Sequence, residues 1–134
     1  MNNDNKISQL RSLLAASAQG TEDVPSGLVD LIPIGMTFVE VKSGMIVWCN
    51  DQLSSMLGYE PGELWGKMTV YELTPEHDWD FTQSQLDSVA TFGRFGWYEK
   101  DYKRKDGSVI RIQIKGYSIE IDGTIYAVTV VDRL

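Results

Sequence analysis

The sequence has very little of what metal centres and disulfide frameworks require. Its 134 residues include one cysteine, Cys49, and one histidine, His77. A single cysteine excludes an intrachain disulfide framework and a zinc site built from cysteines, and a single histidine excludes a multi-histidine metal centre within one chain. A catalytic triad would have to use His77. We therefore expect no metal-binding residues.

Positive charge and long apolar runs are also scarce. The chain carries 12 lysines and arginines against 19 aspartates and glutamates, a formal net charge of −7. Nucleic acids and anionic membranes both bind clustered positive charge, so we expect neither as a partner. No apolar run approaches the ~20 residues of a membrane-spanning helix, and residues 1–6 lack the apolar segment of a signal peptide, so we expect a cytoplasmic protein.

The remaining composition, 43% hydrophobic and 23% charged, is ordinary for a globular domain. We divide the chain into an N-terminal amphipathic helix with a linker, residues 1–27, and one domain, residues 28–134. The helix has a narrow apolar stripe that includes Ile7, Leu10 and Leu14. A helix with so narrow a stripe is only marginally stable alone, so we expect the stripe to pack either on its own domain or on a second copy of the chain.

Hydrophobic periodicity and turn residues predict five strands in the domain. In the longest of them, Ile110, Ile112 and Ile114 alternate with polar or charged residues, which predicts one face in the core and one facing water or a partner. Asp-Gly pairs, typical of tight hairpin turns, separate the last three strands. The predicted strands cover residues 34–40, 45–49, 95–103, 109–121 and 124 or 125 to 131.

The predicted core helices all fall between the second and third strands. Asn50 is a good cap for a short helix over residues 50–57, and Gly58 can end it in the left-handed conformation. A second short helix is predicted to start at Glu60-Pro61, and a single helical turn at residues 70–73.

A longer helix is predicted to follow. Thr74-Pro75-Glu76 is typical of a helix start, with Thr74 as the cap, and Gly93 is expected to end this helix. Two strands, several short helices, one longer helix and three strands form an α+β layout.

Five short motifs, in a consistent order and spacing, carry a resemblance to a known family. From residue 28 to residue 134 the chain resembles a PAS domain. The resemblance implies a five-stranded antiparallel sheet of order 2-1-5-4-3, curled around the helices, with a cavity between its inner face and the long helix. The motifs are Ile34-Gly35-Met36, Asn50, Met56-Leu57-Gly58-Tyr59 with Glu60-Pro61, Leu73-Thr74-Pro75-Glu76, and Tyr102-Lys103-Arg104-Lys105-Asp106-Gly107-Ser108.

The resemblance also implies a role in signal transduction. PAS domains sense small molecules, light or redox state, or serve as dimerisation modules. They commonly lie upstream of output domains of the histidine kinase (two-component), cyclic-di-GMP (diguanylate cyclase) or chemotaxis type. The connection to the output domain often begins at an Asp just after the last strand, and Asp132 matches that position. We therefore expect a sensory input domain whose output domain is not part of this sequence.

Two cofactors fit the sequence poorly: a flavin that bonds to a cysteine and a haem that is bound by a histidine. A flavin–thiol photosensor of this family needs a cysteine near the start of the long helix, where this chain has Glu76-His77-Asp78. Cys49 is interpreted as a small buried hydrophobic residue in the second strand. A haem sensor needs a histidine that points into the cavity. His77 lies among acidic residues in the first helical turn, and we interpret it as a solvated side chain.

Flavin bound without a covalent bond stays open as a hypothesis. An isoalloxazine ring can stack on indole rings, but tryptophan also fills cores and interfaces because it buries a large area. We expect no cofactor, with flavin and haem as the alternatives. The tryptophans are Trp48, Trp65, Trp79 and Trp97.

Any cavity is expected to have bulky apolar walls. Side chains of this size can also fill the cavity, and a ligand that enters would be mostly apolar or aromatic, held by a few polar groups. The predicted lining residues are Phe38, Trp48, Leu53, Met56, Leu57, Trp79, Leu86, Ile112 and Ile114.

Two functional hypotheses follow from these residues. Since no nucleophile–base pair, phosphate-binding loop or metal-ligand group is visible, we do not expect an enzyme. The first hypothesis is a signalling input domain that binds a small ligand. The second is a ligand-free homodimerisation module with a filled cavity. Its contacts would be the N-terminal helix and an outer sheet face carrying Val109, Tyr117 and Tyr126.

Overall fold

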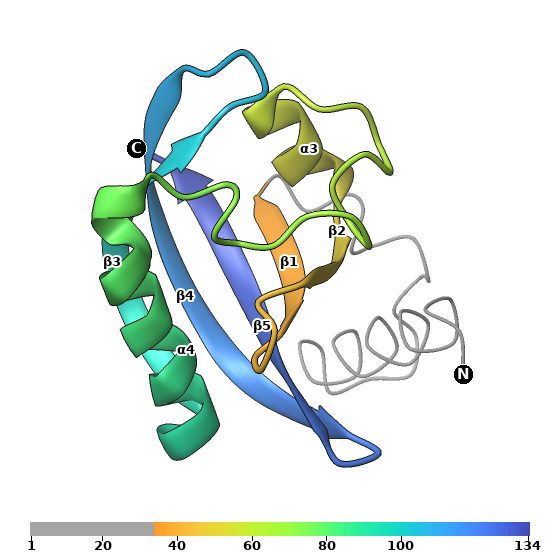
Figure 1. Cartoon of the computed structure of the whole chain (residues 1–134), viewed down its shortest axis with the longest axis vertical. Coiled ribbons are helices and arrows are strands. Elements are labelled where there is room, and N and C mark those ends of the chain that lie inside the picture. The colour runs from red at the N-terminus through yellow and green to blue at the C-terminus, as the bar shows by residue number, and fades with distance from the viewer. Residues whose placement is uncertain (1–33) are drawn as a thin grey trace.

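A computed structural model describes residues 34–134. The predicted N-terminal helix, its part in dimerisation and the domain boundary before residue 28 lie outside the described residues. Five strands form one antiparallel sheet of order β2-β1-β5-β4-β3, which confirms the order implied by the family resemblance (Figure 1). The strands are β1 Gly35–Glu40, β2 Ile46–Cys49, β3 Arg94–Lys103, β4 Val109–Ile121 and β5 Thr124–Arg133.

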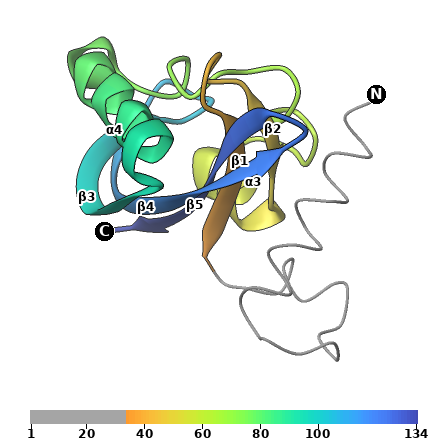
Figure 2. The same ribbon diagram turned by 90° about the horizontal axis from the view of Figure 1, so that it is seen from below.

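The helices of the described region lie between β2 and β3, as predicted. The short helix α3 spans Asp51–Leu57, a 3-10 turn, η1, spans Glu76–Asp78, and the longer helix α4 spans Trp79–Phe92. In Figures 1 and 2, α4 covers the β3–β4 side of the sheet while α3 lies at the β1–β2 side. None of the helices described is both long and apolar enough to cross a membrane.

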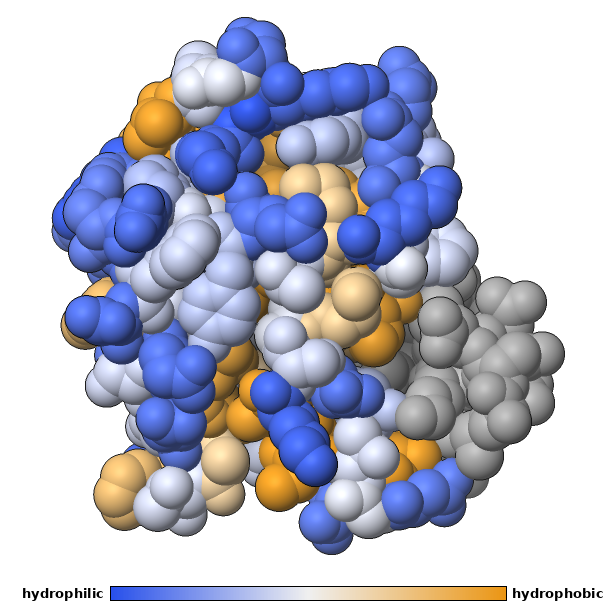
Figure 3. All heavy atoms as spheres, in the orientation of Figure 1, coloured by the Kyte–Doolittle hydropathy of each residue, from blue (hydrophilic) through white to orange (hydrophobic). Residues whose placement is uncertain are grey.

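The main core fills the space between these helices and the sheet. The predicted alternation in β4 is confirmed, because Ile110, Ile112 and Ile114 are buried. On α4, Thr82, Leu86 and Val89 are buried, and their spacing of four and three places them on one helical face. We call the sheet face beneath α4 the inner face. The view in Figure 3 shows mainly hydrophilic residues on the surface, with apolar atoms visible between them.

Asn50 anchors α3 to the sheet. Its Oδ1 accepts hydrogen bonds from the backbone N–H of Leu53, at 3.1 Å, and of Met36 in β1, at 3.0 Å. Its Nδ2 donates to the carbonyl oxygen of Ile34 at 2.9 Å. Gly58 follows the helix with φ of 80°, the left-handed conformation that glycine adopts most readily. The predicted cap and the predicted end of this helix are both confirmed.

Between α3 and η1 the structure has turns where two helical segments were predicted. Residues 61–67 and 70–73 form turns. Gly62 and Gly66 have φ of 86° and 78°, a conformation that a right-handed helix cannot continue through. Thr74 does not cap the long helix either, because its Oγ1 donates to the carbonyl oxygen of Val70 at 2.6 Å.

The outer face of the sheet carries a second buried apolar cluster. Phe38 pairs with Trp48 across β1 and β2, with ring centroids 4.9 Å apart. Tyr126 belongs to this cluster and is fully buried, which corrects its expected place on an exposed face. Val109 and Tyr117 are both 52% exposed.

We expect Asn50→Ala to destabilise the domain by about 2–4 kcal/mol, because it removes the α3 cap and leaves the buried N–H of Met36 without an acceptor. Urea denaturation followed by tryptophan fluorescence measures this change. Ser55→Ala, on the exposed side of the same helix, is the matched control and should change stability by no more than about 0.5 kcal/mol. Equal effects of the two substitutions would contradict the role given to Asn50.

Candidate functional site

A cavity of about 20 Å³ lies between α4 and the inner face of the sheet. Thr82, Gln85 and Leu86 of α4 form one wall, and residues of β1, β3, β4 and β5 form the other. A volume of this size holds about one water molecule. The interior is therefore mostly filled by side chains, but a small space remains under the helix.

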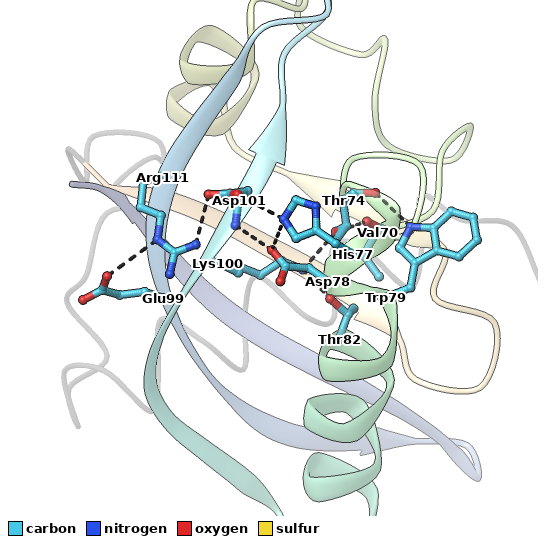
Figure 4. A network of polar contacts seen from close by, with 10 residues as sticks. All are labelled: Val70, Thr74, His77, Asp78, Trp79, Thr82, Glu99, Lys100, Asp101 and Arg111. Atoms are coloured by element: carbon cyan, nitrogen blue, oxygen red, sulfur yellow. Dashed lines mark hydrogen bonds and ion pairs between the residues drawn. The ribbon is translucent and has the colours of Figure 1, made fainter.

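Lys100 of β3 lies against this cavity and is 1% exposed. Its Nζ donates to Oγ1 of Thr82 at 2.6 Å and to Oγ1 of Thr74 at 2.9 Å (Figure 4). The same atom lies 4.9 Å from the centre of the Tyr102 ring. Burial lowers the pKa of the Lys100 ammonium to about 8, opposed by the negative charge of Asp78. A cation that is held by neutral groups in the core is costly, so its presence calls for an explanation.

The opposite wall of the cavity also carries hydroxyl groups. Thr37 of β1 and Thr129 of β5 are paired across the sheet, and their Oγ1 atoms hydrogen-bond to each other. Both residues are buried and line the cavity. The small space under α4 is therefore bordered by polar groups on two sides.

The segment that leads into α4 is joined to the edge strand β3. The backbone N–H of Lys103 donates to the carbonyl oxygen of Leu73 at 2.7 Å, and the backbone N–H of Asp101 donates to Oδ2 of Asp78 at 3.1 Å. Together with the bonds from Lys100, these contacts hold the start of α4 beside the C-terminal end of β3 (Figure 4). They also satisfy donors that an edge strand would otherwise leave open.

Charged residues continue this connection on the outside of β3. Nη1 of Arg111 lies 3.1 Å from Oδ1 of Asp101, and Nε2 of His77 lies 3.2 Å from Oδ2 of the same residue. The hydrogen bond from Arg111, followed by the one from His77, lowers the pKa of the Asp101 carboxyl. These groups are largely exposed, so each pair contributes little to stability.

Among the described residues, one group of side chains lies close enough to share a metal ion. It consists of His77, Asp78 and Asp101, whose candidate ligand atoms lie within 4.8 Å of one another. Asp101 is already paired with Arg111, and Asp78 already accepts from the backbone of β3. Ion pairs and hydrogen bonds thus account for the closeness of the three side chains.

The structure brings few of the predicted lining residues to the cavity. Leu86 and Ile114 do line it. Because successive strand residues point to opposite faces and Thr37 and Val39 point to the cavity, Phe38 points to the outer face, where Trp48 packs on it. This corrects the expected position of both aromatic rings.

The other predicted lining residues lie in the core or at its margin. Leu53, Leu57 and Ile112 are fully buried in the main cluster but do not line the cavity, and Met56 packs at the edge of that cluster. Trp79 is 41% exposed, and its Nε1 donates to the carbonyl oxygens of Thr74 and Tyr71 at 2.8 and 3.0 Å.

Lys100 is the main residue that the sequence analysis missed. Within β3, Tyr98, Lys100 and Tyr102 follow one another at every second position. Strand periodicity places all three on the same face, and two tyrosines indicate that this face is buried. Lysine is almost never fully buried, so the residue type argued against a buried Lys100 although the strand pattern indicated it.

A family model described as PAS domain matches residues 33–133 of the sequence. The chain belongs to the PAS domain family. No curated protein matches it. PAS domains are typically sensory modules rather than catalytic ones, and this family membership supports a sensory or signalling role for the chain.

Solved PAS domains resemble the chain over most of its length. The PAS domain of an HTR-like protein from Haloarcula marismortui is 20% identical, with a TM-score of 0.68, covering 98% of this chain and 97% of that one. A PAS domain of a LuxR-family transcriptional regulator from Burkholderia thailandensis, in complex with ethanol, is 20% identical, with a TM-score of 0.65, covering 83% and 97%. A domain of a sensory box sensor histidine kinase/response regulator from Geobacter sulfurreducens is 16% identical, with a TM-score of 0.64, covering 79% and 88%. At these identities the likeness shows the fold.

The residues of this PAS domain do not fit the larger cofactors considered from its sequence. A cavity of about 20 Å³ admits neither an isoalloxazine ring nor a porphyrin in the conformation described. The His77 side chain is 65% exposed and bound to Asp101 outside β3, so it is not aimed at the cavity. Burial raises the pKa of the Cys49 thiol to about 11, which disfavours the reactive thiolate.

We expect the free energy of unfolding of the wild type to rise with pH relative to that of Lys100→Met. The pKa of Lys100 is lowered to about 8 in the folded state, whereas it is near 10.5 in the unfolded chain. The unfolded state therefore binds more protons between these values, so the cost of the buried cation is greatest below pH 8 and declines as pH rises. Between pH 7 and pH 9.5, the free energy of unfolding of the wild type should rise by about 2 kcal/mol relative to that of Lys100→Met.

Urea denaturation of both proteins at several pH values measures this shift. Lys103→Met, which removes an exposed lysine from the same strand, is the control and should show no such trend. A difference between wild type and Lys100→Met that stays constant with pH would mean that Lys100 keeps its ordinary pKa.

Proposed function

We propose that this PAS domain is a signalling input module that binds a small ligand in the cavity under α4. The observation that carries the proposal is a cavity bordered by a buried cation and by hydroxyl groups from both α4 and the sheet. Apolar packing alone would serve a purely structural core better, since buried ionic groups are often neutral or unfavourable for stability. A few polar groups in a pocket with apolar walls can fix the orientation of a ligand.

The position of the cavity favours transmission through β5. Thr129, in the cavity wall, belongs to β5, which pairs with both β1 and β4 and ends at Arg133. A ligand that prefers one position of α4 over the sheet shifts the equilibrium between positions. The change would pass along β5 to an output domain joined after Asp132, of the histidine kinase, cyclic-di-GMP or chemotaxis type.

The ligand of such a cavity is small, and not the mostly apolar or aromatic molecule expected from the sequence. The cavity of about 20 Å³ holds a group about the size of one water molecule unless α4 moves. The Burkholderia PAS domain, described in complex with ethanol, is a relative of the same fold with a ligand of three heavy atoms. This likeness supports a search among very small molecules.

A thermal-shift screen of very small molecules, neutral and charged, tests the proposed function. A ligand that binds only the folded state stabilises it by about 2.7 kcal/mol at a concentration of 100 times its Kd, so the melting temperature should rise. Val39→Ile adds one methyl group to a residue of the cavity wall and should abolish the rise.

Val109→Ile makes the same chemical change on the exposed outer face and is the matched control. It should keep the wild-type response. If no molecule stabilises the wild type, or if Val39→Ile responds as the wild type does, the cavity is not a binding site and the proposed function is wrong.

Homodimerisation is a second candidate function with its own observation. Trp97, Val109 and Tyr117 are about half exposed, at 49%, 52% and 52%. Nζ of Lys115 lies 5.0 Å from the centre of the Trp97 ring, and Lys115 and Tyr117 point to the same, outer face of β4. Exposed aromatic residues are enriched at protein interfaces.

We expect Tyr117→Asp to convert a dimer to a monomer, because it places a charge in the apolar contact. Light scattering after size-exclusion chromatography measures the mass. Glu120→Asp, a mild change at an exposed position of the same strand, is the control. A dimer that withstands Tyr117→Asp but is lost when residues 1–20 are deleted would assign the contact to the N-terminal segment instead.

A further inference from the structure

The groups around the cavity under α4 are mainly hydrogen-bond donors. An ammonium group has three N–H donors, and Lys100 uses two of them on Thr74 and Thr82. Because Thr82 accepts from Lys100, its own hydroxyl proton is free to donate. Thr37 and Thr129 share a single hydrogen bond, so one of their two hydroxyl protons is also left over. The cavity thus has an excess of donors.

Lys100 has no counter-ion in contact with it among residues 34–134. The negative charge of Asp78 favours the charged form of Lys100. The Asp78 carboxylate, however, accepts from the backbone N–H of Asp101 at 3.1 Å and forms no ion pair with Lys100. A buried cation without a contacting anion is costly, and an anion in the adjoining space would offset that cost.

We propose that the cavity under α4 binds a monovalent anion of one to three heavy atoms, held by the Lys100 ammonium and by the hydroxyl groups of Thr82 and of the Thr37–Thr129 pair. This inference rests on the proposed function, because it names the ligand class of the same cavity. The charge of Lys100 selects for an anion, and the volume of about 20 Å³ excludes larger metabolites. Halides, with one heavy atom, come nearest to this volume, whereas formate and nitrite, with three, also require α4 to move.

Anion titrations of the whole chain at constant ionic strength test the proposal. Sodium chloride, sodium formate or sodium nitrite replaces sodium gluconate, whose anion is far too large for the cavity, and the melting temperature is followed as a function of concentration. We expect at least one small anion to give a saturable rise with the wild type. Lys100→Met should weaken the apparent affinity at least tenfold, and Thr82→Val should weaken it several-fold.

The pH dependence of affinity separates a binding role of Lys100 from a structural one. Affinity should fall at least tenfold from pH 7 to pH 9.5, as Lys100, whose pKa is about 8, loses its proton. The other titratable groups that face Lys100 are Asp78 from η1 and Tyr98 and Tyr102 from β3. Burial raises the pKa of both tyrosines, so they stay neutral in this range.

The outcomes distinguish this inference from the proposed function. Equal responses of Lys100→Met and the wild type, or an affinity that does not change with pH, would overturn the anion site. If Lys100→Met does not fold, Thr82→Val and the pH profile decide.

If ethanol or another small neutral molecule stabilises the wild type and no anion does, ligand binding stands and the anion proposal is wrong. If nothing stabilises it, both are wrong. Lys103→Met, the exposed-lysine control, should respond as the wild type does.

Discussion

The connection between the edge strand β3 and the start of α4 is the constraint on which the rest of the site depends. Backbone groups of Lys103 and Asp101 bind Leu73 and Asp78, and the Lys100 ammonium binds Thr74 and Thr82. These bonds place α4 across the inner face, where its buried side closes the cavity. Further hydrogen bonds, from Trp79 to Thr74 and from Ser88 to Arg94, also hold α4.

Stability and function make opposing demands on Lys100. Burying its charge among hydroxyl groups costs free energy, yet its two hydrogen bonds hold α4 in place. A ligand of opposite charge would reduce that cost and strengthen the connection. The same arrangement can therefore serve both as a structural link and as a point where a small molecule changes the position of a helix.

The inner and outer faces of the sheet have separate roles. The inner face carries the cavity, and the outer face carries a buried cluster around Phe38 and Tyr126 together with the half-exposed Trp97 and Tyr117. The central strand β5 contributes to both faces, since Thr129 lines the cavity and Val128 belongs to the outer cluster. One strand thus borders both the cavity and the outer cluster.

The strands, the α3 cap and the family could be predicted from the sequence, because hydrophobic alternation, Asn50, Gly58 and the turn glycines act over a few neighbouring residues. The composition of the site depends instead on contacts between distant parts of the chain. Phe38 is paired with Trp48 and lies between Thr37 and Val39, which line the cavity, so both aromatic rings lie on the outer face. Lys100 is buried only because Thr74 and Thr82, 26 and 18 residues away in the chain, supply its acceptors. Local sequence cannot show partners that folding brings together across such distances.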